Sequence, residues 1–70
     1  MRVSAKVQAH TRQLILKTAH RLFCLVGYET ATMRDIAKAV GVATGTLFNY
    51  FSGKESIAAT LVLSRLHAVI

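Results

Sequence analysis

The chain has 70 residues, enough for one small domain, and nine Lys and Arg against three Asp and Glu give it a net charge of +6. Its 53% apolar content excludes a disordered chain, and the single cysteine, Cys24, excludes an intrachain disulfide. The positive charge favours a polyanionic partner, either nucleic acid or an anionic membrane. The apolar stretches are too short to span a bilayer, and the basic start lacks the apolar core of a secretory signal. We therefore expect a soluble, cytoplasmic protein.

The first part of the chain predicts an arm followed by a helix. Residues 1–10 carry basic charge without apolar periodicity, which favours a flexible basic arm. From Thr11 the sequence becomes amphipathic, and Leu16 and Leu25 lie off its main stripe, which indicates a second contact surface. Gly27 is expected to end the helix because glycine readily adopts the left-handed conformation of a C-terminal cap. The main apolar stripe consists of Ile15, Ala19, Leu22, Phe23 and Val26.

The middle of the chain predicts two short helices joined by a tight turn. Thr32 and Asp35 have the spacing of a capping box, which marks the start of the first of them. Gly41 supplies the turn, and the second helix is expected from about Thr44 to Tyr50. Such a helix-turn-helix holds one helix away from the core, so that it can enter the DNA major groove. The residues expected to face inward are Ile36, Ala37, Val40, Leu47 and Phe51.

A fourth helix is expected to begin near Gly53, where Ser52 and Glu55 have capping-box spacing, and to continue toward Ile70. It is apolar nearly all round, which indicates partners on both sides and a larger helical body beyond it. The predicted fold class is all-α: a three-helix bundle with a helix-turn-helix, followed by the start of a connecting fourth helix. The DNA-binding domain is placed at residues 11–56. The remaining residues, 57–70, are read as the lead into a helical domain.

Residues from about 12 to 61 resemble the N-terminal domain of the tetracycline-repressor (TetR) family of transcriptional regulators. The resemblance implies a ligand-responsive repressor that binds a palindromic operator in double-stranded DNA as a homodimer. It also implies a small-molecule effector bound by a domain absent here, no cofactor and no enzymatic activity. Ala43, Phe48 and Val40 depart from the Ser, Tyr and Ala that are common in the family. The matching motifs are Leu22-Phe23, Gly27-Tyr28, Thr32, Ile36-Ala37, Gly41-Val42, Gly45-Thr46-Leu47-Phe48, Tyr50-Phe51 and Lys54-Glu55.

The residues expected to read bases lie on the third helix. Asn49 has the amide for a bidentate contact to adenine, although a solvated Asn is an equal alternative, and the Thr46 methyl suits a thymine methyl. Gly45 lets the backbone approach the groove floor, and a core position is the alternative for Phe48. The complete predicted base-reading set is Thr44, Gly45, Thr46, Phe48 and Asn49.

Phosphate contacts are expected from basic side chains and hydroxyls around that helix. Arg2 and Lys6 are further candidates, in the minor groove, on charge alone. Lys54 is included because of its position in the family motif, and the Tyr50 hydroxyl has a core position as its alternative. The complete predicted phosphate-binding set is Arg12, Thr32, Arg34, Tyr50 and Lys54.

Other function classes have less support. His20 and Cys24 are four residues apart on a helix, but no further ligand is placed to complete a metal site. No nucleophile–base pair and no complete phosphate-binding loop appears. A helical protein-interaction module with incidental charge is the main alternative. A membrane-surface peptide is disfavoured because glycines interrupt any long amphipathic helix.

Overall fold

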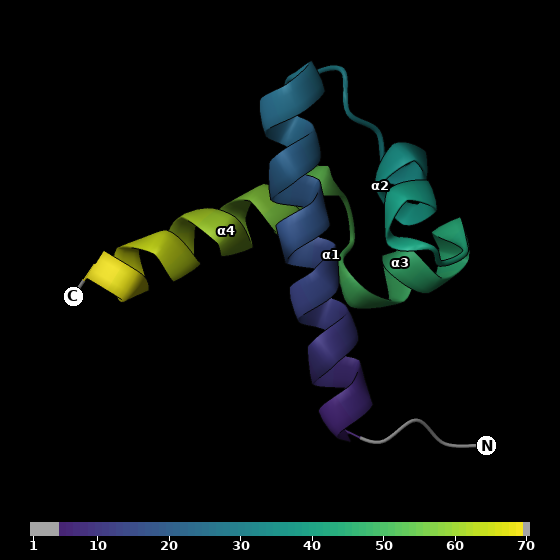
Figure 1. Ribbon diagram of the computed structural model, residues 1–70, viewed down its shortest axis with the longest axis horizontal. Coiled ribbons are helices and arrows are strands. Elements are labelled where there is room, and N and C mark those ends of the chain that lie inside the picture. The colour runs from purple at the N-terminus through teal and green to yellow at the C-terminus, as the bar shows by residue number, and fades with distance from the viewer. Residues whose placement is uncertain (1–4, 70) are drawn as a thin grey trace.

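The computed structural model describes the backbone of residues 5–69 and the side chains of residues 7–64. Within that part of the chain the regular structure is entirely helical, which confirms the predicted all-α class. Figure 1 shows α1 as a long central helix, with α2 and α3 on one side of it and α4 leaving on the other. The helices are α1 (Ala5–Val26), α2 (Met33–Val40), α3 (Thr44–Tyr50) and α4 (Lys54–Val69).

One apolar cluster joins the four helices. Its largest fully buried side chains come one from each helix, in the order α1 to α4: Ile15, Ile36, Leu47 and Ile57. Leu16, predicted to lie off the main stripe, belongs to this cluster as well, whereas Val26 of that stripe is exposed. Ile57 lies in the core, so the predicted domain boundary after residue 56 falls inside a continuous helix that the core requires.

α1 begins earlier than its amphipathic pattern indicates. The helix starts at Ala5 rather than at Thr11, so residues 5–10 extend the helix instead of forming an arm. The physical reason is local: this stretch contains good helix formers and no Gly or Pro, so the helix continues without an apolar face to bury. Arg2 and the side chain of Lys6, the candidates for a minor-groove contact, lie outside the described residues.

The helix-turn-helix forms as predicted. The Thr32 hydroxyl accepts from the Asp35 amide at 3.0 Å, and the Asp35 carboxylate accepts from the Thr32 amide at 3.2 Å, which completes the capping box. Gly41 ends α2 with φ 95°, in the left-handed region that favours glycine. Gly27 ends α1 in the same way, with φ 91°. These caps set the direction in which the chain leaves each helix.

The N-terminus of α4 differs from the predicted capping box. The helix begins at Lys54, and among the described side chains Ser52 and Glu55 make no reciprocal capping bonds. The Gly53 carbonyl instead accepts from the Ser56 and Ile57 amides at 3.1 and 3.3 Å, so Gly53 takes the cap position. Backbone geometry alone thus begins this helix.

The two glycines of the helix-turn-helix should respond oppositely to alanine. Gly41→Ala places a Cβ on a left-handed residue and should destabilise the fold by about 1–2 kcal/mol. Gly45→Ala should stabilise it by up to about 1 kcal/mol, because its φ is ordinary and a Cβ there would meet no atom within 4 Å. Thermal unfolding of both variants measures this, and an equal loss in the two would contradict the backbone assignment.

The N-terminus of α3 offers a second stability test. Ala43 occupies its N-cap with extended geometry, φ −67° and ψ 149°, and contributes no side-chain cap. Ala43→Ser should therefore raise the free energy of unfolding by about 1 kcal/mol, and Thr32→Ala should lower it by about as much by removing an existing cap. Urea unfolding measures both changes. If Ala43→Ser leaves the midpoint unchanged, the cap geometry at α3 is not as described.

Candidate nucleic-acid interface

α3 divides into an anchored side and a free side. Leu47 is fully buried and fixes the helix to the core, and Phe51 at its C-terminus is 4% exposed. This seven-residue helix therefore cannot rotate about its axis without removing Leu47 from the core. Four other positions of the helix are exposed to solvent, with the first and last opposite Leu47 and the middle two on the flanks: Gly45, Thr46, Phe48 and Asn49.

These four residues belong to the predicted base-reading set, and we call them the α3 face. The structure brings them together on one surface, and Phe48 is 48% exposed, as expected of a side chain outside the core. Thr44, the fifth predicted reader, is half-buried at the border of this face. Tyr50 lies at the other border, where it is half-buried and packs against the core cluster. Its ring thus takes part in the core, as the alternative interpretation had it.

The fold does not require a glycine at position 45. An added Cβ would have nothing within 4 Å, and the backbone there is in an ordinary conformation. Glycine inside a short helix costs about 1 kcal/mol relative to alanine. The described residues therefore give no packing or backbone reason for a glycine at this position.

The N-terminus of α2 presents the predicted polar residues to solvent. Thr32 is exposed, and its hydroxyl oxygen already accepts the Asp35 amide, which leaves the hydroxyl hydrogen free to be donated. Arg34 is exposed in the first turn of the helix. The capping box therefore fixes the place from which both side chains project.

Arg12 of α1 is held near the end of α3. Its guanidinium carbon lies 5.3 Å from the centroid of the Phe51 ring, a cation–π contact between residues far apart in the sequence. Arg12 itself is exposed. The buried Phe51 ring thus contacts an exposed guanidinium at the C-terminal end of α3, a placement that charge pattern alone did not predict.

Lys54, a predicted phosphate contact, makes its hydrogen bonds within the chain. Its ammonium donates to the carbonyls of Tyr28 at 2.6 Å, Ala31 at 3.1 Å and Glu29 at 3.2 Å. An ammonium has three N–H donors, and all three are used within the chain. A phosphate contact from Lys54 would require one of these bonds to break.

Tyr28 completes the surroundings of Lys54 and was missed as a functional residue in the sequence. The Lys54 nitrogen lies 4.5 Å from the centroid of its ring, and the Phe23 ring meets it edge-on with centroids 5.1 Å apart. Loss of solvent around the phenol, together with the negative charge of Glu55 and Glu29, raises the pKa of Tyr28 above its ordinary 10.0. Tyr28 is therefore neutral at physiological pH. Its presence in the Gly27-Tyr28 motif was the available signal.

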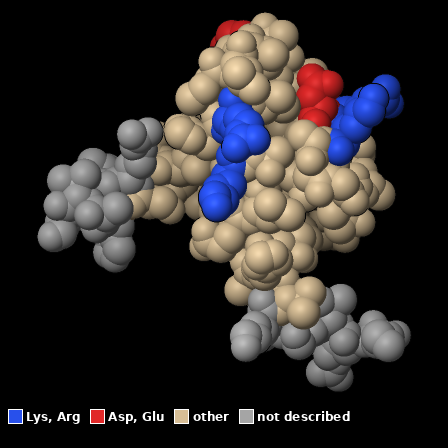
Figure 2. Space-filling view, viewed as in Figure 1, with Lys and Arg blue, Asp and Glu red and all other residues tan. Residues whose placement is uncertain are grey.

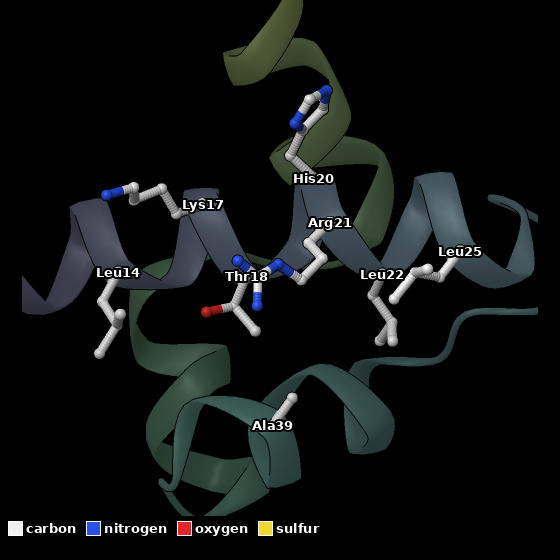
Figure 3. Close-up of a pocket in the computed structure, with 8 residues that line it drawn as sticks. All are labelled: Leu14, Lys17, Thr18, His20, Arg21, Leu22, Leu25 and Ala39. Carbon is white, nitrogen blue, oxygen red and sulfur yellow. The ribbon is translucent and has the colours of Figure 1, made fainter.

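The charge on the outer surface is distributed in separate groups. Figure 2 shows one group of Lys and Arg side chains over α1 and another beside α2. The group over α1 borders an open hollow of about 630 Å³ between α1 and α2 (Figure 3). Leu14 and Leu22 of α1 point toward α2, where Ala39 faces them. No residue of the α3 face lines this hollow, so it belongs to a separate surface.

The described part of the chain contains no candidate metal site and no helix that could span a membrane. The Cys24 Sγ and His20 Nε2 atoms lie 3.9 Å apart on the exposed side of α1, but the described residues hold no group of three or more His, Cys, Asp or Glu that would suit a metal ion. None of the described helices combines the length and the apolar character needed to cross a membrane.

Relatives that are named as transcriptional regulators match about two thirds or more of this chain. The chain is 46% identical over 46 residues to the HTH-type transcriptional repressor AcnR of Corynebacterium diphtheriae, a match that covers 66% of this chain and 24% of AcnR. It is 34% identical over 53 residues to the HTH-type transcriptional regulator UidR of Escherichia coli, with 76% of this chain and 27% of UidR covered. The chain thus spans about a quarter of the length of these relatives.

A solved structure and a family model agree with these relatives. The fatty acid degradation regulator FadR from Bacillus halodurans superimposes with a TM-score of 0.77 at 29% identity, over 97% of this chain and 33% of FadR. The model of the bacterial regulatory proteins of the tetR family matches residues 15–61, which include the core residues from Ile15 to Ile57 and the whole α3 face. This chain belongs to the TetR family of bacterial regulatory proteins.

Proposed function

We propose that this chain is the DNA-binding part of a transcriptional repressor and that it reads the DNA major groove with the α3 face. The observation that carries the proposal is the division of α3 described above, in which one buried leucine presents four neighbouring small, polar and aromatic residues to solvent. A helix held in this way has the size and the exposure that a major-groove helix needs.

Each member of the α3 face has a chemical role in this proposal. Asn49 offers an amide to adenine, and the methyl group of Thr46 and the ring of Phe48 offer apolar contacts to base edges. Gly45 lets the helix backbone lie against the groove, which accounts for a glycine that the fold does not need. Thr44, half-buried at the border, contributes its hydroxyl to a base edge or to a phosphate.

The phosphate contacts are assigned to residues at the rim of the α3 face. Arg34 and Thr32 project from the start of α2, and Arg12 projects from α1 above the Phe51 ring. Tyr50 remains in this set through its hydroxyl, at the border of the face. Arginine suits this task because its planar guanidinium matches phosphate geometry and stays charged. We leave Lys54 out of the set because its three donors are engaged within the chain.

The complete protein is proposed to act as a homodimer on a palindromic operator. Two recognition helices must then be held about 34–36 Å apart, one turn of DNA, and this chain supplies one of them. AcnR, a similar protein, is named as a transcriptional repressor, which supports repression as the mode of regulation. Dimerisation and the response to a small-molecule effector are assigned to helices beyond this chain, because the chain spans only a quarter of its relatives' length.

A bulky side chain at Gly45 gives a steric test of the docking geometry. Gly45→Leu should abolish binding to a duplex selected from a random DNA pool while leaving the fold intact, because the position is exposed and a Cβ there would meet no atom within 4 Å. Ala59→Leu is the matched control, since it adds a leucine side chain at an exposed position of α4 and should leave binding unchanged. Fluorescence anisotropy measures the affinity and circular dichroism the helix content. Normal binding by folded Gly45→Leu would place α3 outside the groove.

Base-reading and phosphate-binding residues should separate by mutation. Arg34→Ala should weaken binding to all duplexes about equally and reduce the slope of log affinity against log salt by about 0.9. Thr46→Ala should instead relax the preference at one or two base pairs, at a cost of about 1–3 kcal/mol for the favoured site. Lys17→Ala, which removes a charge beside the hollow, is the control for net charge. Binding that does not depend on salt would favour a protein-interaction module over this proposal.

A further inference from the structure

The three acceptors of Lys54 all lie in the turn that joins α1 to α2. The carbonyls of Tyr28, Glu29 and Ala31 surround the ammonium, and the Tyr28 ring lies 4.5 Å from it. We call these three oxygens and this ring the carbonyl socket. Carbonyls just beyond a helix C-terminus carry partial negative charge and have no helical partners, so a cation is the partner that suits them.

The carbonyl socket is built for a compact cation. Hydrogen bonds from an ammonium to oxygen are stronger than those between neutral groups, and the contacts with Tyr28 and Ala31 are partly buried, which reduces competition from water. The Phe23 ring meets Tyr28 edge-on and holds it in place under the charge. A guanidinium is planar and cannot direct three donors from one atom. The socket therefore distinguishes lysine from arginine.

The carbonyl socket connects the first residue of α4 to the residues that begin α2. Ala31, whose carbonyl accepts one of the bonds, is fully buried and immediately precedes Thr32, the N-cap of α2. Thr32 and Arg34 thus project from a helix start whose position is fixed by Lys54, 22 residues later than Thr32 in the sequence. Without the ammonium, the turn keeps the Gly27 cap and the buried Ala31 methyl but loses three hydrogen bonds.

We propose that Lys54 is a positioning residue for DNA binding, which fixes the α1–α2 turn so that Thr32 and Arg34 meet the phosphates, and that it is not itself a phosphate ligand. The inference rests on the proposed function, because it assigns a role in the same DNA contact. It differs from the phosphate role predicted from the family motif. The two roles make opposite predictions for arginine at this position.

The first test is made on the chain without DNA. Lys54→Met removes the ammonium and keeps a stem of similar length, and exchange of the Ala31 amide should then become about tenfold faster. That amide bonds to the Gly27 carbonyl at 3.0 Å within the same turn. Exchange of the Leu47 amide should stay as in the wild type, which separates loosening of the turn from loss of the fold. Lys38→Met, at an exposed position of α2, is the matched control. Unchanged exchange at Ala31 would overturn the proposal.

The second test is the affinity for a selected duplex at several salt concentrations. Lys54→Met should weaken binding about tenfold, as expected when a charged hydrogen-bonded group is lost, and the salt slope should fall to the extent that Arg34 loses its phosphate contact. Lys54→Arg should bind as weakly as Lys54→Met, because arginine keeps the charge but does not fit the carbonyl socket. Recovery of the wild-type affinity and salt slope in Lys54→Arg would identify a direct phosphate contact and overturn the proposal.

A double-mutant cycle with Arg34 completes the design. If Lys54 acts by positioning Arg34, then Arg34→Ala should cost clearly less affinity in the Lys54→Met background than in the wild type. Additive losses would overturn the proposal, because they describe two independent contacts. Absence of DNA binding by the wild-type chain would overturn the proposed function, and this inference with it. The outcomes specific to Lys54 overturn this inference alone.

Discussion

The structure depends on one apolar contact that all four helices share. Ile15, Ile36, Leu47 and Ile57 each come from a different helix, and each is fully buried. Burial of such a side chain contributes about 1.5–3 kcal/mol, a large share of the stability available to a domain of this size. Helices of seven and eight residues are too short to be stable alone in water. α2 and α3 therefore exist as helices because this cluster holds them.

The same contact determines what α3 offers to a partner. Leu47 occupies its inward position and sets the rotation of the helix about its own axis, so the residues on the opposite side have no partner in the core. Gly41 sets the direction of the α3 axis relative to α2, because its left-handed backbone directs the chain from α2 into α3. Because the rotation of this short helix about its axis and the direction of its axis are both fixed, it presents the same four residues in every molecule. That constancy is a requirement for reading a DNA sequence by shape and hydrogen bonding.

Polar contacts add a second level of order around this core. The capping box at Thr32 begins α2, the Phe51 ring orients Arg12, and the carbonyl socket ties Lys54 to the α1–α2 turn. Each of these contacts lies at an end of an element, where apolar packing by itself leaves the chain direction free. The three contacts thus hold the positive side chains and the turns in place relative to the α3 face.

The local pattern of the sequence determined the helix-turn-helix. The spacing of Thr32 and Asp35, the glycine at Gly41 and the periodicity around Leu47 predicted the start of α2, the turn and the bounds of α3, all of which the structure confirms. These features were predictable because each depends on residues within about one helical turn of one another, so the physical cause lies inside a short window of sequence.

The tertiary structure alone decided the partners of the cations. Lys54 meets carbonyls 23 to 26 residues away, and Arg12 meets a ring 39 residues away, in contacts that exist only after the helices have packed. Two local features were also missed: helix formers extend α1 to Ala5 without any apolar signal, and the Gly53 backbone caps α4 in place of the predicted Ser52 and Glu55 side chains. Patterns within a short window of sequence reveal burial and side-chain caps. The partner of a charged surface side chain depends instead on which groups the folded chain brings near it.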